Sequence, residues 1–209
     1  MMLCEYFPPF DQGGSEWSVY HLARQLISDK YIVSILTPNY GGKSREKYRG
    51  IEIYRFPFVK LQRYQNFPVA PYLFSNIWWW IKPTWYLYKF IIRTKPTHLH
   101  VQGKYFLPAA IIAAKIVGIP VVVTVRDYII LCPHAYCITK ERNYRSCTLQ
   151  EAITLDFPQT LKIRSIRNRW HKFFLLLATL WGWLVSKLLT FFLKQASVTV
   201  AISKKLAQI

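Results

Sequence analysis

The sequence contains four short polar segments that could bind a ligand, each directly after an expected strand. In the first, Gly13 and Gly14 precede Ser15 at the start of an expected helix. Glycines without side chains let a ligand approach the backbone N–H groups, and the helix dipole favours an anion there. We predict that Gly13 and Gly14 bind substrate, although an ordinary turn explains two glycines before a helix equally well.

The second segment places His100, Gln102 and Gly103 at the end of the expected strand HLHV, and we predict that they bind substrate. A single histidine at such a place also has a structural interpretation. In the third segment, Arg126 and Asp127 directly follow the apolar strand VVVTV, in a long stretch without another acid. An Arg–Asp pair there can hold hydroxyls or phosphate, or it can brace the loop.

The fourth segment contains Ser203, which we interpret as a helix cap. The elements that position all four segments alternate between strand and helix patterns. Strands are predicted at 1–7, 32–36, 51–56, 98–101, 121–125 and 197–202, and helices at 15–28, 73–92, 107–117 and 162–194. Pro83 predicts a kink or a split in the second helix.

This alternation predicts an α/β fold: a Rossmann-like, doubly wound, mostly parallel sheet with helices on both faces. In such sheets the ligand crevice lies beyond the carboxyl ends of the strands, where the first three segments are expected. We expect residues 1–209 to form a single domain of this kind, because the length fits one large domain and no linker interrupts the sequence.

The charge is strongly basic, with 28 Lys and Arg against 10 Asp and Glu, a formal net charge of +18. Nineteen of the basic residues lie in two acid-free segments, 53–126 and 157–209, which also contain seven of the eight tryptophans. Anionic lipid, phosphate-bearing small molecules and nucleic acid all attract such a surface. We expect no nucleic-acid partner, because no nucleic-acid motif is present and aliphatic residues flank the tryptophans.

Four cysteines in a chain whose start lacks a secretory signal argue against a disulfide scaffold and indicate a cytoplasmic protein. Cys132, Cys137 and Cys147, with His134 nearby, permit a zinc site. Their spacing differs from the usual CxxC pairs, so free thiols are the preferred interpretation and we expect no metal.

Three runs together carry a family resemblance: EYFPPFDQGGSEWSVYHLARQL, KPTHLHVQGKYFLPAAIIAAKIVGIPVVVTVRDYIILCP and SVTVAISKKL. They resemble the N-terminal domain of glycosyltransferase family 4, the retaining GT-B enzymes. The resemblance implies a hexosyltransferase that moves a sugar from a nucleotide-sugar donor to a saccharide or lipid-linked acceptor with retention, without a metal or other cofactor. It also implies that this chain is the acceptor-side half, that the C-terminal nucleotide-sugar-binding domain is absent, and that the fragment alone is inactive.

Carried over to this sequence, the resemblance places Gly13 and Gly14 near the donor phosphates or the acceptor. It places Asp127 near the anomeric carbon as the catalytic residue, with Arg126 beside it. Many members have His where this chain has Arg126, and an arginine cannot serve as a general base at neutral pH.

The second acid-free segment runs from basic LKIRSIRNRWHK into apolar FFLLLATLWGWLVSKLLTFFLK. This order suits a helix in a membrane interface, with basic groups on anionic headgroups and Trp181 and Trp183 near the glycerol level. A spanning helix and a core helix are the other interpretations. We therefore expect peripheral attachment to the inner face of a membrane, and the alternative function is a non-catalytic basic membrane-binding α/β module.

Overall fold

The computed structural model describes residues 1–10, 13–58, 77–133, 146–204 and 206–208. The chain forms two compact units, one of Met1–Thr124 with Ala196–Val198 and the other of Val125–Gln195 with Thr199–Ile209. The boundary passes within the last two strands. That residues 1–209 form one domain stays a prediction.

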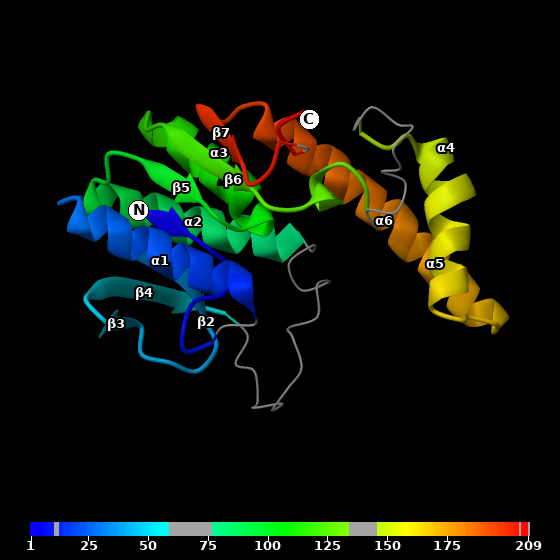
Figure 1. Ribbon diagram of the computed structural model, residues 1–209, viewed down its shortest axis with the longest axis horizontal. Helices are drawn as coiled ribbons and strands as arrows, with labels where there is room; N and C mark the ends of the chain where they lie inside the picture. Colours follow the sequence, from blue (N-terminus) through cyan, green and yellow to red (C-terminus); the bar gives the residue numbers. More distant parts are fainter. Residues whose placement is uncertain (11–12, 59–76, 134–145, 205, 209) are drawn as a thin grey trace. The chain divides into compact units, whose positions relative to one another are not determined.

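The first unit alternates strands and helices (Figure 1). Its elements are β1 (Met2–Leu3), α1 (Gly14–Ser28), β2 (Ser34–Asn39), β3 (Arg45–Tyr48), β4 (Ile51–Pro57), α2 (Ile77–Thr94), β5 (Leu99–Val101), the 3₁₀ turn η2 (Lys104–Phe106), α3 (Leu107–Val117) and β6 (Val121–Val125). Gly118 ends α3 in the left-handed conformation, at φ 77°, as expected for a helix stop.

The sheet has the strand order β3-β4-β2-β1-β5-β6-β7, where β7 is Val198–Ala201. The β1–β2, β1–β5, β2–β4 and β5–β6 pairs are parallel, and β3 pairs with β4 in the antiparallel sense. The chain thus winds from β1 outward to β2 and β4, and then returns to the other side of β1 through β5. The predicted doubly wound, mostly parallel sheet is confirmed.

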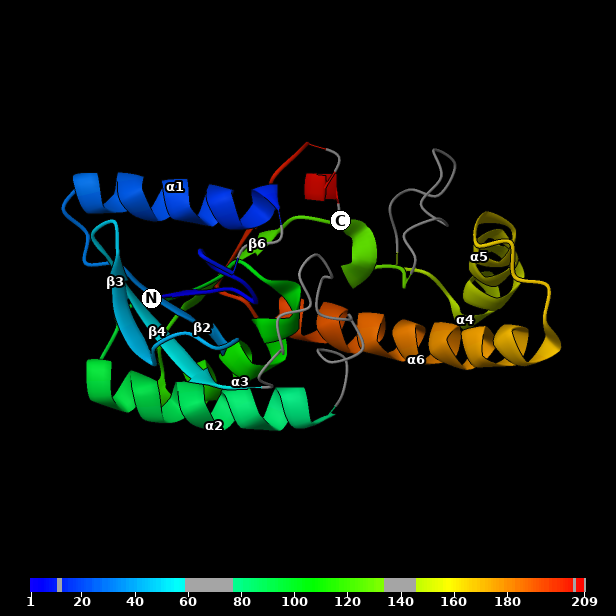
Figure 2. The same ribbon diagram turned by 90° about the horizontal axis from the view of Figure 1, so that it is seen from below.

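Helices cover both faces of the sheet in the first unit (Figure 2). On one face, α1 buries Val19, Tyr20 and Ala23 against Ile35 and Ile53 of the strands. On the other face lie α2 and α3, and aromatic rings fill the core there. The rings of Trp79 and Phe106 lie 5.3 Å apart, and both lie about 6 Å from Phe56, at 6.1 and 5.8 Å.

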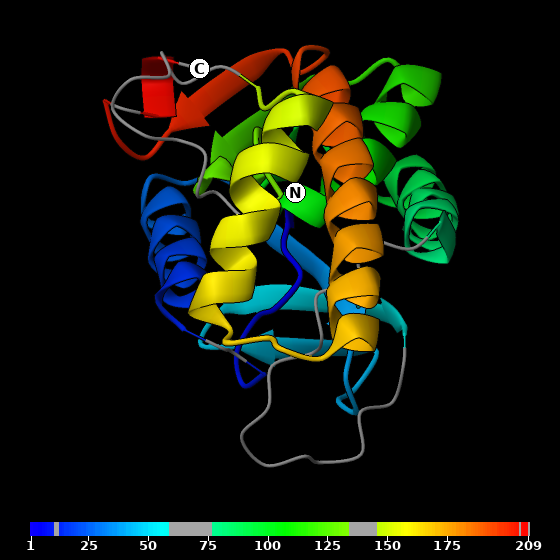
Figure 3. The same ribbon diagram turned by 90° about the vertical axis from the view of Figure 1, so that its right-hand side faces the viewer.

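The second unit is mainly helical. It contains η3 (Tyr128–Ile130), α4 (Leu149–Glu151), the π-helical turn η4 (Ala152–Asp156), α5 (Phe157–Ile163), α6 (Arg169–Leu193) and η5 (Leu206–Gln208). The segment from α4 to α5 runs alongside α6 (Figure 3). Ser186 and Thr190 of α6 donate hydrogen bonds to the carbonyls of Ile129 and Ile130, so η3 is tied to α6.

Several elements differ from the sequence predictions. The first strand is shorter than predicted, and the helical run from α4 to α5 was not predicted. The strand β3 was not predicted, because its sequence REKY is charged and polar, as is common at the edge of a sheet. The helix α2 continues through Pro83 without a split, and a kink at this proline stays a prediction. The long helix predicted at 162–194 begins only at Arg169, as α6, because Ser165 has φ 50° and Asn168 caps α6 by accepting a hydrogen bond from the Trp170 N–H.

Candidate functional site

The winding of the sheet reverses at β1, whose two neighbours are β2 and β5. In an open α/β sheet, ligands bind beyond the carboxyl ends of the strands at this topological switch point. The loops that follow β1 and β5, after Leu3 and Val101, are therefore the first place to look for a site.

Glu5 and Gly103, one from each of these two loops, lie in direct contact. The Glu5 carboxylate accepts a hydrogen bond from the backbone N–H of Tyr105 at 2.7 Å. A Cβ on Gly103 would lie 1.6 Å from Glu5 Oε2, so only a glycine leaves room for the carboxylate. The loop after β1 is thereby fastened to the loop after β5.

The environment of Glu5 changes its proton affinity. Burial of the carboxyl raises the pKa of Glu5 to about 6, an effect that backbone hydrogen bonds and the charge of Lys104 partly offset. A carboxyl that titrates near neutral pH can exchange a proton with a ligand under working conditions. Perturbed acids of this kind are concentrated at functional sites.

Tyr40, from the loop after β2, closes the other side of the β1 loop. Its hydroxyl donates a hydrogen bond to the backbone carbonyl of Glu5 at 2.6 Å, and its ring stacks on Tyr6 with centroids 5.3 Å apart. Burial raises the pKa of Tyr40 well above its usual value, so the hydroxyl stays protonated and keeps donating. The position of Glu5 is thus fixed from both neighbouring strands.

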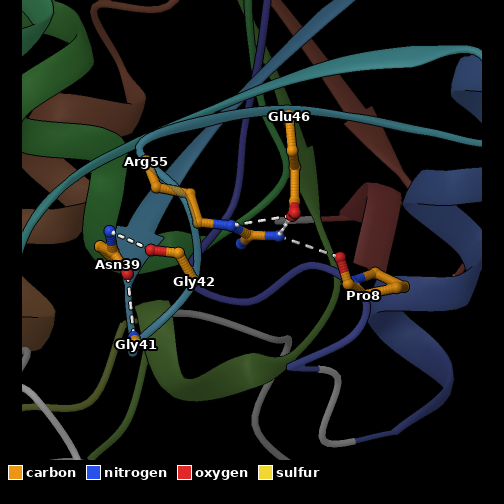
Figure 4. A network of polar contacts seen from close by, with 6 residues as sticks. All are labelled: Pro8, Asn39, Gly41, Gly42, Glu46 and Arg55. Atoms are coloured by element: carbon orange, nitrogen blue, oxygen red, sulfur yellow. Dashed lines mark hydrogen bonds and ion pairs between the residues drawn. The ribbon is translucent and has the colours of Figure 1, made fainter.

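Arg55, near the end of β4, joins the loops further out (Figure 4). Its guanidinium donates to Glu46 on β3 and to the carbonyl of Pro8 at 3.1 Å. Asn39 shapes the adjacent turn, because its side chain accepts from the Gly41 N–H at 2.8 Å and donates to the Gly42 carbonyl at 3.0 Å.

Two buried polar atoms on neighbouring strands lack a hydrogen bond within the part of the chain that the structure describes. They are Nη1 of Arg55 and Oγ1 of Thr37, and these two residues are register partners on β4 and β2. Buried polar atoms are almost always satisfied, so such a pair indicates a place where water or a polar ligand group is bound.

His100, Gln102 and Gly103 do come together at the end of β5. His100 Nε2 lies 2.8 Å from the hydroxyl of Thr124 and 2.8 Å from the side-chain nitrogen of Gln102. These contacts account for the histidine structurally. Gly103 leaves room for the Glu5 carboxylate. Substrate binding by His100, Gln102 and Gly103 stays a prediction.

Gly13 and Gly14 lie exposed at the start of α1, and a Cβ on either would meet no atom within 4 Å. A ligand can therefore approach them. The Gly13 N–H already donates to the carboxylate of Glu16 at 2.9 Å, and the Ser15 hydroxyl donates to the same carboxylate at 2.6 Å. A phosphate at this helix start would have to compete with Glu16, so anion binding there stays a prediction.

Arg126 and Asp127 belong to the second unit. Asp127 is half-buried and caps η3, since its Oδ1 accepts a hydrogen bond from the Ile129 N–H at 3.0 Å. This hydrogen bond supports the interpretation that Asp127 braces its own loop. The catalytic role of Asp127 stays a prediction. Ser203 caps η5 through the Leu206 N–H, at 3.2 Å.

A cavity of about 700 Å³ lies on the α2 side of the first unit. It is lined by the cations Arg45, Lys89 and Arg93 and by the aromatic residues Tyr54, Tyr86 and Phe90. Arg45 also forms an ion pair with Glu52. Volume and lining are those of a small-molecule site that accepts a negatively charged group.

One group of side chains among the described residues has the chemistry to hold a metal ion: Cys132, Cys147 and Asp156 of the second unit. Cys137 and His134, which the sequence grouped with them, lie outside the described residues.

The sequence analysis missed Glu5, Tyr40 and Arg55. The signal for Tyr40 was available, because it directly follows β2. Glu5 lies two residues beyond β1 but inside the longer strand predicted at 1–7, which hid its position after a strand. Arg55 stands two residues after Ile53 and four after Ile51, so on β4 its side chain points to the same buried face as these isoleucines. A charge at such a position was the signal for Arg55.

Comparison with known proteins connects this chain with one family. The sequence model described as Glycosyltransferase Family 4 matches residues 12–209. The phosphatidylinositol N-acetylglucosaminyltransferase GPI3 subunit of Saccharomyces cerevisiae, found in three strains, is 35% identical over 71 residues. This match spans 33% of the present chain and 16% of the yeast protein.

Proposed function

Because the chain belongs to glycosyltransferase family 4, we propose that it is the acceptor-side part of an enzyme that moves a sugar from a nucleotide-sugar donor to a saccharide or lipid-linked acceptor with retention. The observation that carries this proposal is the family match over residues 12–209. The donor would be held by a further nucleotide-sugar-binding domain, and this chain alone is expected to be inactive.

In this reaction the bond between the anomeric carbon and the donor phosphate breaks while the acceptor oxygen bonds to that carbon. The proton of the acceptor hydroxyl passes to the departing phosphate oxygen of the donor. In the proposed reaction Asp127 orients this hydroxyl and stabilises the positive charge on the sugar, and Arg126 holds a phosphate or hydroxyl without taking a proton. No metal is required for these steps, and Gly13, Gly14, His100, Gln102 and Gly103 are the proposed substrate contacts.

The cavity beside α2 supports an acceptor that is both ring-shaped and anionic. Aromatic residues offer flat apolar surfaces for a sugar ring, and Lys89 and Arg93 attract a phosphate. A lipid-linked saccharide has both features. The yeast relative, whose printed name is that of a phosphatidylinositol glycosyltransferase, agrees with a lipid-bearing acceptor.

The exposed side of α6 supports attachment to a membrane. Large apolar residues recur on it at helical spacing, and each is at least 42% exposed: Trp170, Phe174, Leu177, Trp181, Leu184 and Phe191. The exposed cations Lys162, Arg164, Arg167, Arg169 and Lys172 precede or begin the helix. An apolar face flanked by basic residues is typical of interfacial helices.

By length and composition, α6 is the one helix among those described that is long enough and apolar enough to cross a membrane, with a hydropathy of 1.7. We favour peripheral binding on the cytoplasmic side, because five cations stand at its start.

Transfer is tested on the complete reading frame that encodes this chain, incubated with a panel of nucleotide sugars and with acceptor lipids in vesicles. Asp127→Asn is the decisive variant, since asparagine can still cap η3 through its side-chain oxygen. We expect its kcat to fall about 100-fold or more. The control is Asp29→Asn at the exposed end of α1, which should keep full activity.

A complete protein that turns over no nucleotide sugar but still binds vesicles would instead support the alternative function, a non-catalytic membrane-binding module. Membrane binding is measured separately by co-sedimentation with vesicles of increasing anionic lipid content. Trp170→Ser combined with Phe174→Ser should weaken binding about tenfold or more. The control pair is Tyr31→Ser with Ile32→Ser, because these residues are also exposed but lie outside α6. Equal loss in both pairs would argue against a role for α6.

A further inference from the structure

Three side chains that can ligate a metal converge in the second unit. The sulfur atoms of Cys132 and Cys147 and a carboxylate oxygen of Asp156 all lie within 4.8 Å of one another. The three residues are 0%, 3% and 0% exposed. They come from separate places in the chain, which are the segment after η3, the segment before α4, and the last position of the π-helical turn η4.

Backbone hydrogen bonds hold the two cysteines side by side. The Cys147 N–H donates to the carbonyl of Leu131 at 3.0 Å, next to Cys132. The indole N–H of Trp183 donates to the Cys147 carbonyl at 3.0 Å, which fastens this segment to α6. The sulfurs are therefore positioned by the main chain and by a helix, not by their own side-chain torsions alone.

Asp156 reaches the cysteines from a π-helical turn of five residues, Ala152–Asp156. Such turns are rare and occur frequently at functional sites. The hydroxyl of Thr160 donates to the Asp156 carbonyl at 2.8 Å in the following turn. The Cys132 thiol lies 2.8 Å from Asp156 Oδ2. Buried charges in proteins are usually paired or bound to metal. Binding of a cation between this buried carboxylate and the two thiols would therefore be favourable.

We infer that Cys132, Cys147 and Asp156 form a structural zinc site. Thiolate sulfur and carboxylate oxygen are ligands of Zn²⁺, at about 2.3 Å and 2.0–2.2 Å. With those bond lengths, tetrahedral geometry separates the sulfur and oxygen ligands by roughly 3.5 Å. The observed distance of 2.8 Å between Cys132 Sγ and Asp156 Oδ2 would have to increase by roughly 0.7 Å to reach this separation. Binding releases two protons from the thiols, and the fourth position is completed by water or another donor.

The surrounding core explains what the ion would do. The buried cluster around the site consists of Leu131, Cys132, Cys147 and Ala152, so cysteines make up half of it. Three metal–ligand bonds would connect the end of η3, the start of α4 and the end of η4. Metal binding that only the folded state allows adds directly to folding stability. This role is separate from sugar transfer, and the inference does not depend on the proposed function.

The spacing of the cysteines argued against zinc at the sequence level, because only residues within one loop were compared. Asp156 lies nine residues beyond Cys147, and the π-helical turn brings it to the sulfurs. The site is defined without Cys137 and His134.

The test uses the full chain, produced in zinc-supplemented medium and purified without chelators. We expect about one zinc per chain by elemental analysis, and a sulfur-to-metal charge-transfer band after exchange with Co²⁺. Cys147→Ser and Asp156→Asn should each lose the metal. The matched control is Cys4→Ser, since Cys4 is also a buried cysteine but belongs to the first unit.

Wild-type protein that contains no zinc and gives no cobalt–sulfur band would overturn the inference, and these two readouts remain decisive if the variants fail to fold. Titration of thiols that reveals a Cys132–Cys147 disulfide would overturn it too. So would equal loss of metal in Cys4→Ser.

Discussion

The carboxylate of Glu5 occupies the space in which a side chain on Gly103 would have to lie, with Oε2 only 1.6 Å from the position of a Cβ there. The two residues are nearly one hundred positions apart in the sequence, and they meet where the sheet reverses its winding. The packing between the loops after β1 and β5 therefore depends on the absence of one side chain.

Gly103→Ala should destabilise the protein. The backbone of Gly103 is extended, at φ −121° and ψ 129°, so alanine fits the backbone and the steric conflict decides the result. The displaced Glu5 carboxylate would leave the Tyr105 N–H without its acceptor, at a cost of about 1–3 kcal/mol in the free energy of unfolding. Urea denaturation measures this. Gly14→Ala, where a Cβ meets nothing, is the control and should cost far less.

Glu5 should make stability fall as pH rises. Its pKa in the folded state is about 6, above the ordinary value of 4.5, so the folded state binds this proton more tightly. The resulting stabilisation is complete below pH 4.5 and is lost as pH rises through 6, by about 2 kcal/mol. Glu5→Gln removes this contribution, and urea denaturation of both proteins between pH 4 and 7 measures the difference. Parallel pH profiles would contradict the assignment.

Arg55→Met should cost much more than Arg45→Met. The Arg55 side chain is fully buried, pairs with Glu46 and also holds the Pro8 carbonyl, so its loss leaves a partly buried acid and a loop without its anchor. We expect about 3 kcal/mol. Arg45 forms a similar pair with Glu52, but its side chain is 66% exposed, and we expect less than about 1 kcal/mol. Equal losses in thermal or urea unfolding would show that burial does not determine the strength of these pairs.

Gly182→Ala should destabilise the second unit, against the usual trend for helices. Alanine normally stabilises a helix interior by about 0.5–1 kcal/mol relative to glycine. Here a Cβ would lie 2.8 Å from the Cβ of Pro133, directly after Cys132. A proline ring cannot move aside easily, so we expect a net loss of about 1–3 kcal/mol. A rise in melting temperature for this variant would disprove the close contact.

The sequence predicted those elements that follow from local patterns. The spacing of Val19 and Ala23 marked α1, Gly118 marked the end of α3, and the alternation of strands and helices led to the doubly wound sheet. The charged edge strand β3 was missed because hydrophobic alternation is absent from it. The break before α6 was missed because the signals, Ser165 and Asn168, do not interrupt the basic and apolar pattern.

The site was harder to predict because its contacts are long-range. His100, Gln102 and Gly103 could be grouped because they lie within a few residues of each other, and their binding of substrate stays a prediction. Glu5 and Asp156 could not be paired with their partners, because the contacts depend on which strands become neighbours and on a local π-helical turn. Spacing along the chain carries neither kind of information.

The hydrogen bond from Trp183 to the Cys147 carbonyl gives the second unit a built-in optical probe. The Lys187 ammonium lies 5.7 Å from the centre of the same indole. Because the indole N–H bonds to the carbonyl of Cys147, one of the proposed sulfur ligands, a movement of Cys147 would change the fluorescence of Trp183. A variant that keeps Trp183 while its other tryptophans are replaced by phenylalanine would let metal binding be followed by light emission alone.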